Sequence, residues 1–417
     1  MKKIALHWQI LIAILLAVPF GIFFHTLPPN IKFIGDMFIN ALKMIAIPVV
    51  LTSLITGVAS LGGYKDLGRL AGKTFAFYIG TTALAGTIGI ILVNIFKPGV
   101  GVDLNLSETV TDLPATSLSF GEQVKAMIPS NIVHAIANGD MLPIIFFAIL
   151  FGYFITKVAK EHQDFMIKLF ESGFEIFMKI TLFIVRFTPL GVFAIVSNII
   201  AAQGGDPQRL AAVIGSLGLF TMIIWGGCLI HGGIILPSLV YAFTKLNPYK
   251  HIKQMSVPLL TAFTTCSSGA ALPLTIRDSQ EKTGISNKIA SFVLPLGSTV
   301  NMNGTALYEG VTAIFIAQAY GIDLTITQEI VIIVTAVLAS IGAAGIPMAG
   351  LVMISVVLLA VGLPLEGIGL VLAVEQLCDM IRTTTNVYGD TCASVIIAHT
   401  EGEKLNLPRL FPKRAEA

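Results

Sequence analysis

The sequence predicts an all-α polytopic membrane protein with eight transmembrane helices and two re-entrant helical hairpins. Of its 417 residues, 55% are hydrophobic and only 12% are charged, which excludes an ordinary soluble domain. Long runs without charge recur along the chain, and they are long enough to cross a bilayer core of about 30 Å. Two of the later runs are interrupted at their middle by Gly, Ser and Pro, a composition that favours a break in a helix.

Six ordinary spans come first in the chain. They are expected near residues 8–28, 34–62, 74–96, 132–155, 168–202 and 210–243. Only Lys2 and Lys3 precede the first span, and no small-residue cleavage site follows it, so we expect an uncleaved helix rather than a signal peptide. The formal net charge of +2 and the lack of a Gly-rich phosphate loop point away from nucleic acid and nucleotide hydrolysis. We therefore expect a protein that is not an enzyme and has no organic cofactor.

Basic residues recur at every second connection between the predicted spans. They lie in residues 2–3, 65–73, 157–160 and 245–253, whereas loops 97–131 and 203–209 carry less basic charge. Because Lys and Arg gather on the cytoplasmic side of short loops, these four groups mark the cytoplasmic face. We expect a multi-pass protein of the plasma (inner) membrane with both termini in the cytoplasm.

The first broken segment covers residues 254–276, which contain no charged side chain. Cys266–Pro273, rich in Ser, Gly and Ala, interrupts it near the middle. Lys250 and Lys253 precede the segment and Arg277 follows it, so basic residues bracket both ends. We expect a re-entrant hairpin that opens to the cytoplasm.

The second broken segment, residues 330–365, is a charge-free run of 36 residues. As one helix it would be about 54 Å long, too long to cross a core of about 30 Å once. Its centre, Ser340–Gly350, leaves about ten apolar residues, or roughly 15 Å, on each side. Acidic residues at Asp323, Glu329 and Glu366 bracket the segment, so we expect a hairpin that opens to the outside. The alternative for both segments is a pair of kinked helices in a bundle.

Each hairpin is followed by a full span with a polar centre, at Asn301–Thr305 and Arg382–Asn386. Two such units of opposite orientation form an inverted repeat. Broken backbone at membrane depth is tolerated only where protein or a water-filled cavity satisfies it. Paired broken segments therefore predict a binding site near the bilayer midplane.

The last span carries five polar residues on one predicted helix face. They are Glu375, Asp379, Arg382, Asn386 and Asp390, spaced by three or four. A charge at a helix centre costs roughly 2.5–3.5 kcal/mol on insertion scales, so this face must be paired, hydrated or used. An internal ion-pair network is the alternative for the Glu375 end.

Asp379 and Arg382 suit a ligand that carries both an ammonium and a carboxylate, such as an acidic amino acid. A second ligand carboxylate fits the Gly- and Ala-rich hairpin tips, whose free backbone N–H groups bind anions. At the second hairpin, the tip residues assigned to this role are Ala344, Gly345, Ala349 and Gly350.

Oxygen ligands for a cation cluster in the same region. Asn301, Asn303, Asn386 and Asp390, with backbone carbonyls freed near Gly297 and Gly304, are of the kind that Na⁺ needs. For each Asn taken singly, the alternative is a hydrogen bond between helices. Glu309, the only acid between Glu281 and Asp323, is a candidate proton carrier, with a solvated cavity lining as its alternative.

These motifs resemble the glutamate/aspartate transporter family, the dicarboxylate/amino acid:cation symporters that include the excitatory amino acid transporters. The matches are Ser267-Ser268, Asn301–Leu307, Ser340–Gly350 and Asp379–Asp390, and the resemblance covers essentially the whole chain. Inverted repeats are a known architecture of this family. The resemblance implies a homotrimer in which a static scaffold surrounds a transport domain that moves like an elevator.

The resemblance also divides the chain. The expected parts are 1–72 (scaffold helices 1 and 2), 73–131 (transport-domain helix 3 and an external loop), 132–205 (scaffold helices 4 and 5), 206–249 (transport-domain helix 6), 250–284 (hairpin one), 285–322 (transmembrane helix 7), 323–365 (hairpin two, the external gate) and 366–417 (transmembrane helix 8 and a cytoplasmic tail).

The same resemblance assigns residues to sites. The substrate shell is Ser267, Ser268, Thr305, Asp379, Arg382, Thr383 and Asn386, with Asp379 on the amino group and Arg382 on the side-chain carboxylate. The three sodium sites are Gly297, Asn301, Asn386 and Asp390; Thr299, Ser340, Ile341 and Ala343; and Tyr78, Thr81, Thr82, Asn301 and Asn303.

Asn303 stands where sodium-coupled members usually carry Asp, which weakens the third site. Glu309 matches the proton carrier of the excitatory amino acid transporters and implies proton coupling with potassium return. Asp390 speaks against a purely proton-coupled type, whose members tend to carry Asn there.

The leading hypothesis is sodium-coupled symport of L-aspartate or L-glutamate across a lipid bilayer. One alternative is a proton-coupled dicarboxylate or neutral amino acid symporter of the same family. Arg382 argues against the neutral substrates, and Asp379 argues against the dicarboxylates. A second alternative is an anion-conducting channel, which would show flux without saturable coupling to a cation gradient.

Overall fold

The computed structural model describes residues 6–24, 26–61, 68–101, 125, 127–203, 206–342 and 349–410. The regular structure in these ranges is helical, with one isolated antiparallel bridge between Leu246 and Arg409, so the predicted all-helical class is confirmed. The elements are α1 (Leu6–Phe23), α2 (Pro28–Leu61), α3 (Gly68–Phe96), α5 (Ile132–Asn138), α6 (Met141–Ile155), α7 (Lys160–Val185), α8 (Thr188–Ala202), α9 (Pro207–Ile230), η3 (His231–Ile235), α10 (Leu236–Thr244), α11 (Pro248–Gln254), α12 (Ser256–Thr265), α13 (Ser268–Glu281), α14 (Asn287–Val300), α15 (Asn303–Ala319), α16 (Ile326–Gly342), α17 (Ala349–Ala360), η4 (Leu365–Gly367), α18 (Ile368–Val371) and α19 (Glu375–Thr400).

Several helices have the length and composition of membrane spans. Within the described ranges, three pass on both counts: Pro28–Ala59, Arg69–Phe96 and Ala211–Thr244. A fourth span results if α7 and α8, which meet at a bend of 52°, are counted as one. Shorter apolar helices include α1, α6, α16 and α17.

Two of the predicted spans are each divided into two helices. Residues 132–155 form two helices, because Gly139 ends α5 with a left-handed backbone (φ 80°) and α6 begins two residues later. Residues 168–202 belong to the bent pair α7 and α8, and α7 already begins at Lys160. Pro189 lies in the first turn of α8, where a backbone N–H has no partner within the helix and its absence costs nothing. In one continuous helix from α7 to α8, the same proline would remove a backbone hydrogen bond.

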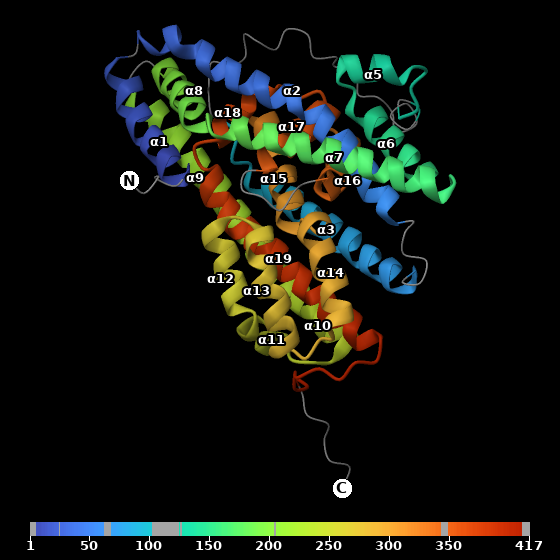
Figure 1. Cartoon of the computed structure of the whole chain (residues 1–417). Helices are drawn as coiled ribbons and strands as arrows, with labels where there is room; N and C mark the ends of the chain where they lie inside the picture. Colours follow the sequence, from blue (N-terminus) through green and yellow to red (C-terminus); the bar gives the residue numbers. More distant parts are fainter. Residues whose placement is uncertain are drawn as a thin grey trace, which may run out of the picture.

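The helices pack in two groups. In the first, α2 contacts α6, α7 and α8, and α1 packs against α8. In the second, α15 contacts α3, α16, α17 and α19, while α10 and α12–α14 pack on α19. Figure 1 shows α19 running diagonally from the first group toward the lower end, with α10–α14 around it. Contacts of α16 and α17 with α2 join the groups.

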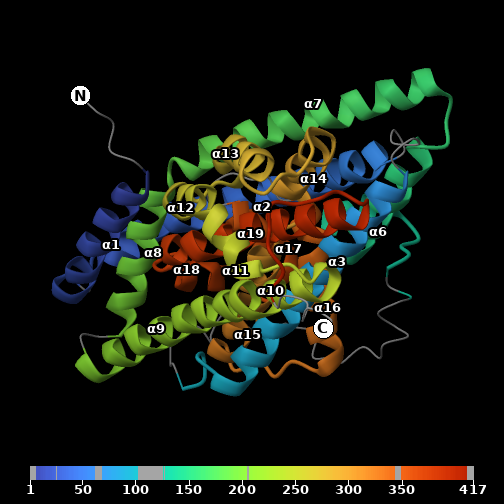
Figure 2. The ribbon, with the colours of Figure 1, turned by 90° about the horizontal axis from the view of Figure 1, so that it is seen from below.

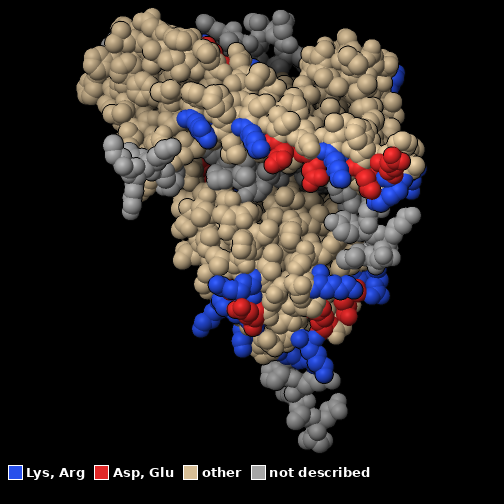
Figure 3. Space-filling model, in the orientation of Figure 1, with Lys and Arg blue, Asp and Glu red and all other residues tan. Residues whose placement is uncertain are grey.

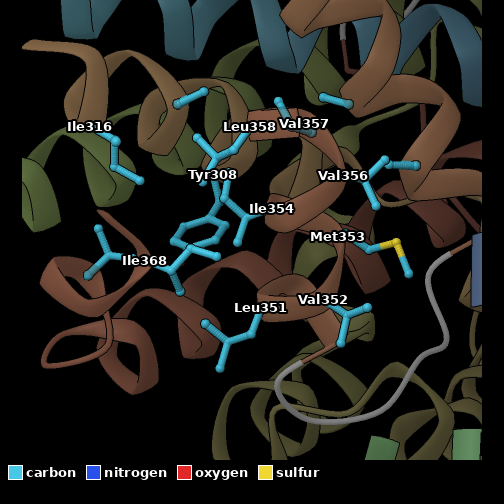
Figure 4. Packing of buried hydrophobic residues seen from close by; sticks show 14 of the residues in the cluster. Tyr308, Ile316, Leu351, Val352, Met353, Ile354, Val356, Val357, Leu358 and Ile368 are labelled. Atoms are coloured by element: carbon cyan, nitrogen blue, oxygen red, sulfur yellow. The ribbon is translucent and has the colours of Figure 1, made fainter. Parts of the chain in front are cut away.

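Helix α17 is enclosed by protein. Figure 4 shows its side chains from Leu351 to Leu358 beside Tyr308, Ile316 and Ile368. Each of Leu351, Ile354 and Leu358 is fully buried. A helix that is apolar all round belongs in an interior, so α17 fits a position inside the second group.

The outer surface is largely apolar. Leu15 and Phe23 of α1 are 64% and 74% exposed. On the face drawn in Figure 3, charged side chains form a row along α7 and a second group at the lower end, with mostly uncharged surface elsewhere. A broad exposed apolar surface of this kind indicates contact with a membrane or a partner.

The first predicted hairpin is broken where expected. Helix α12 ends at Thr265, and Cys266 has a left-handed backbone (φ 52°). Ser267 caps α13 by accepting a hydrogen bond from the N–H of Ala270 at 3.2 Å. Since α12 and α13 contact each other, the two arms lie side by side.

The second hairpin consists of α16 and α17, which also contact each other. Its tip, residues 343–348, lies outside the described residues, and with it Ala343, Ala344 and Gly345 of the predicted sites. The arms contain 17 and 12 residues, so the prediction of about ten on each side was too short.

The chain after α19 ties several elements together at the lower end. Glu403 Oε2 accepts a hydrogen bond from the N–H of Ser286 at 3.0 Å, before α14. The N–H of Asn406 donates to the carbonyl of Thr283 at 2.8 Å, after α13. The carbonyl of Pro408 accepts from the N–H of Asn247 at 2.8 Å, between α10 and α11. Residues 401–410, the tail segment, therefore hold both sides of the first hairpin.

Candidate substrate and cation site

The polar face predicted for the last span lies inside the protein. Glu375, Asp379, Arg382, Asn386 and Asp390 all lie on α19, and each is between 1% and 3% exposed. Helix α19 is continuous over this stretch, so the spacing of three and four residues brings the five side chains to one face. The prediction of an inward-facing polar stripe is confirmed.

Arg382 is the hub of a buried ion-pair network. Its Nη2 lies 2.9 Å from Glu375 Oε1 and 2.8 Å from Asp379 Oδ1, and its Nε donates to Asp379 Oδ1 at 3.2 Å. The guanidinium also stacks over the Tyr308 ring, with Cζ 4.5 Å from the ring centroid. The ion-pair alternative for Glu375 is thus confirmed, and Tyr308 is a contributor that the sequence argument missed.

One edge of the Arg382 guanidinium faces the second hairpin. Its Nη1 has no hydrogen-bond partner among the described residues. A side-chain carbon on Gly350 would collide with this Nη1 and would lie 2.8 Å from Cζ, so only glycine allows α17 to approach so closely. A buried N–H donor without a partner is costly, and a ligand carboxylate at this place would satisfy it.

Asp379 is held from two sides. It accepts hydrogen bonds from the Arg382 guanidinium and from Thr383 Oγ1, the latter at 2.9 Å. Both contacts orient its carboxylate toward the same region as Arg382. The two residues predicted to read a zwitterionic ligand are therefore brought together.

Asn386 links α19 to the start of α15. Its Oδ1 accepts from the N–H of Gly304 at 2.7 Å, and its Nδ2 donates to Thr305 Oγ1 at 3.1 Å. The Sδ of Met302, not predicted as a site residue, lies 3.3 Å from the same Nδ2. Gly304 is needed here, because a side chain on it would strike the Arg382 backbone.

The span after the first hairpin is broken at Asn301 and Met302, between α14 and α15. The sequence predicts a span loosened at Gly297 and Gly304, but both residues are helical and the break falls between them. The glycines instead permit close approach of other groups. A side-chain carbon on Gly297 would lie 2.6 Å from the Tyr78 hydroxyl and would collide with Asp390.

Asp390 and Asn301 form the core of the first predicted sodium site. Asn301 Nδ2 donates to Asp390 Oδ1 at 2.8 Å, and Asn301 Oδ1 is buried without a partner among the described residues. A carboxylate beside an unsatisfied amide oxygen suits a hard cation such as Na⁺.

The third predicted sodium site has a neutral amide at its centre. Asn303 Oδ1 accepts from Thr82 Oγ1 at 2.7 Å. Thr81 Oγ1 donates to the carbonyl of Phe77 at 2.8 Å and lies 3.4 Å from Asn303 Oδ1. The Tyr78 hydroxyl donates to the carbonyl of Val293 at 2.8 Å. The three hydroxyls are thus used in hydrogen bonds, so this group is arranged as a hydrogen-bond network.

The second predicted sodium site is only partly described. Thr299 is exposed and donates to the carbonyl of Leu296 at 3.1 Å. Ser340 is buried and donates to the carbonyl of Val337 at 2.7 Å. Ala343 lies outside the described residues, as does the side chain of Ile341.

The first hairpin approaches α19 through its tip. Gln376 Nε2 donates to Cys266 Sγ at 3.1 Å, a contact that was not predicted. Ser268, in the first turn of α13, is 3% exposed. The side chain of Ala349, at the start of α17, is outside the described part of the chain.

Glu309 is fully buried on α15, and neither carboxyl oxygen has a hydrogen-bond partner among the described residues. An ionised carboxylate is not stable in such a place without a counter-charge or a proton. Full burial leaves this side chain without solvent contact, and its role as a proton carrier stays a prediction.

The buried acids outnumber the buried bases around α19. Among the described residues, the buried carboxyl groups of this region are those of Glu309, Glu375, Asp379 and Asp390. The one buried guanidinium is that of Arg382, which contacts Glu375 and Asp379. When all are ionised, four negative charges against one positive charge leave a formal charge of −3. This region can therefore accept cations or protons.

Comparison with known proteins gives a consistent result. The model of the sodium:dicarboxylate symporter family matches residues 6–400. The proton/glutamate-aspartate symporter of Escherichia coli (strain K12) is 35% identical, over 96% of this chain and 93% of its own length. The proton/sodium-glutamate symport protein of Bacillus caldotenax is 34% identical, over 97% of this chain and 96% of its own length. The C4-dicarboxylate transport protein of Bacillus subtilis (strain 168) is 32% identical, over 95% and 93%.

The family match covers both helix groups, the two broken segments and the whole polar face of α19. The chain belongs to the sodium:dicarboxylate symporter family.

Proposed function

We propose that the chain is a secondary active transporter that carries an acidic amino acid, L-aspartate or L-glutamate, together with Na⁺. The observation that carries this proposal is the surplus of buried carboxyl groups around α19, where Glu309, Glu375, Asp379 and Asp390 outnumber the single guanidinium of Arg382. An acidic amino acid adds a further negative charge. Burying that charge without compensation costs several kcal/mol, so cations must enter with the substrate.

The substrate class follows from Asp379 and Arg382 together. An acidic amino acid supplies an ammonium for Asp379 and a carboxylate for Arg382 Nη1, which faces Gly350. A dicarboxylate would bring no ammonium to Asp379. A neutral amino acid would leave the Nη1 without an acceptor.

Sodium is proposed at the site of Gly297, Asn301, Asn386 and Asp390, where a carboxylate and an unpaired amide oxygen are available. A second Na⁺ is proposed at Thr299, Ser340, Ile341 and Ala343. For Asn303, we propose that the neutral amide does not hold an ion by itself, since its oxygen already accepts a hydrogen bond from Thr82 Oγ1 at 2.7 Å.

Glu309 is proposed to carry a proton in the loaded state and to release it on one side of the membrane. Its burial, with no hydrogen-bond partner in the part of the chain that the structure describes, supports this role. Return of the empty carrier with K⁺ is part of the same proposal. The relatives named as proton or proton/sodium symporters support proton coupling without fixing the number of ions.

For the mechanism, we propose an elevator-type movement in a homotrimer. The scaffold would consist of residues 1–72 and 132–205, and the remaining chain would move. Eight transmembrane helices, two hairpins of opposite orientation in an inverted repeat, cytoplasmic termini and a plasma-membrane location complete this proposal. The two packing groups support it, because α2, α6, α7 and α8 pack mainly on one another.

The test uses purified protein in liposomes with labelled aspartate outside. Gradients of Na⁺, H⁺ and K⁺ are imposed one at a time, and unlabelled glutamate, succinate and serine are used as competitors. We expect uptake that requires an inward Na⁺ gradient and is inhibited by glutamate only. Uptake without Na⁺ would contradict sodium coupling. Inhibition by succinate would favour a dicarboxylate carrier, and inhibition by serine would favour a neutral amino acid carrier. Flux that does not saturate with substrate would favour a channel.

A further inference from the structure

A groove lies between α3, α10 and the last turns of α19, on the outer side of α3, and of the predicted site residues only Thr81 lines it. Its volume is about 520 Å³. Figure 2 shows α3 and α10 on the same side of α19. The walls are mostly apolar, with Phe77, Leu84, Phe243 and Ile397 among the lining residues and Lys73 and Thr400 at one end.

The groove opens on the apolar outer surface. Both Arg69–Phe96 and Ala211–Thr244 qualify as membrane spans, but only 39% of either window is buried inside the protein. Phe243 is 59% exposed and Leu84 is 39% exposed. A side-chain carbon on Gly80, which lines the groove, would meet no atom within 4 Å. The space is therefore accessible from the side of the helices that faces the bilayer.

The length of the groove matches one leaflet. From Lys73 to Leu84, α3 rises by about 16 Å, since each residue adds 1.5 Å. This is about half of a hydrocarbon core of roughly 30 Å. One end of the groove is thus at the level of the charged residues, and the other is near the middle of the membrane.

The charged end carries a net positive charge. Lys73 Nζ lies 2.7 Å from Glu401 Oε1, and Arg69 Nη2 lies 2.6 Å from Glu401 Oε2. Two cations therefore share one carboxylate, which leaves a formal charge of +1. The Arg69 side chain is 76% exposed, so it can contact a further anion.

We propose that this groove binds one acyl chain of an anionic phospholipid, with the lipid phosphate beside Arg69 and Lys73. The apolar walls match the chain, the length matches one leaflet, and the net positive charge selects an anionic head group over a zwitterionic one. The proposal is independent of which solute the protein transports.

The test measures lipid bound to the purified full-length protein by native mass spectrometry, with phosphatidylglycerol or phosphatidylcholine of identical chains. We expect one phosphatidylglycerol to be retained more strongly than phosphatidylcholine. Gly80→Trp fills the groove and should abolish this difference. Gly72→Trp is the matched control, because Gly72 lies on the same helix, also has no atom within 4 Å of an added side-chain carbon, and does not line the groove.

Arg69→Gln provides a second variant that does not disturb the interior. It should weaken phosphatidylglycerol binding about fivefold, the factor expected for one basic residue near the membrane surface, and leave phosphatidylcholine unchanged. Equal retention of the two lipids by the wild type would overturn the proposal. So would retention by Gly80→Trp at the level of Gly72→Trp, or an Arg69→Gln variant that binds phosphatidylglycerol as tightly as the wild type.

Discussion

Replacement of Arg382 by Met tests its two roles, one in the buried ion-pair network and one in substrate binding. The guanidinium lies 2.8 Å and 2.9 Å from the oxygens of Asp379 and Glu375, and all three groups are almost completely buried. Arg382→Met leaves two buried carboxylates without a counter-charge. Breaking a buried pair by removing one partner costs about 3–5 kcal/mol, so the variant should unfold at a clearly lower temperature.

Substrate binding should change in the same variant. Truncation of one partner of a buried charge pair weakens binding by about 2–5 kcal/mol, which is a loss in aspartate affinity of at least about thirtyfold. A neutral amino acid such as serine does not use the guanidinium, so its binding should be retained or improved. Isothermal titration of the purified protein with both ligands in Na⁺ measures this difference.

Two controls make the result specific. Adding Glu375→Gln to Arg382→Met removes one of the two unpaired carboxylates and should restore most of the stability but none of the aspartate affinity. Arg209→Met makes the same chemical change at an exposed arginine, 3.8 Å from Asp206, and should affect neither quantity. A single variant as stable as wild type would refute the ion-pair reasoning, and unchanged aspartate affinity would refute the carboxylate role.

Three further predictions concern other groups. Glu309→Gln should remove the dependence of uptake on the proton gradient in liposomes while Na⁺-driven uptake remains; persistent proton dependence would exclude Glu309 as the carrier. Asn303→Asp places a carboxylate beside Thr82 and should steepen the Na⁺ dependence of aspartate binding, so an unchanged slope would contradict a lost ion site. Hydrogen bonds from Lys73 and Arg69 lower the pKa of Glu401, so this carboxylate stabilises the fold at neutral pH, and its contribution declines as the pH falls below about 4.3. Glu401→Gln should therefore unfold at a lower temperature than wild type at pH 7 and at a similar one near pH 3, and a difference that persists in acid would contradict this assignment.

The polar face of α19 could be predicted from the sequence, because the helix is continuous and the spacing of charges gives the face directly. Asp379 and Arg382 were identified for the same reason. The bend between α7 and α8 was not predicted, although Arg186 and Pro189 lie at it. One charged residue did not mark an end to the apolar run, and the break depends on how Pro189 starts a new helix.

Long-range partners were the main omission. Tyr308 reads as an ordinary aromatic residue in an apolar helix, and only the packing of α15 against α19 brings its ring under Arg382. Met302 was not predicted as a site residue. Its thioether sulfur lies near Asn386 because the helix is broken at Asn301 and Met302, which the sequence does not show. Gly297 and Gly304 were singled out from the sequence, but for another reason than the one the structure gives. Gly297 allows the Asp390 side chain to approach closely and Gly304 allows the Arg382 backbone to do so, whereas neither loosens the helix.

The tail segment has a practical meaning for anyone who handles the protein. Three hydrogen bonds, one in the α10–α11 connection and two in the α13–α14 connection, join these loops to residues 401–410. A proteolytic cut near Glu403 would separate α19 from the residues that hold the two loops at the base of the first hairpin. Truncated forms should therefore keep the chain through Leu410, and a fusion partner or affinity tag belongs beyond that point.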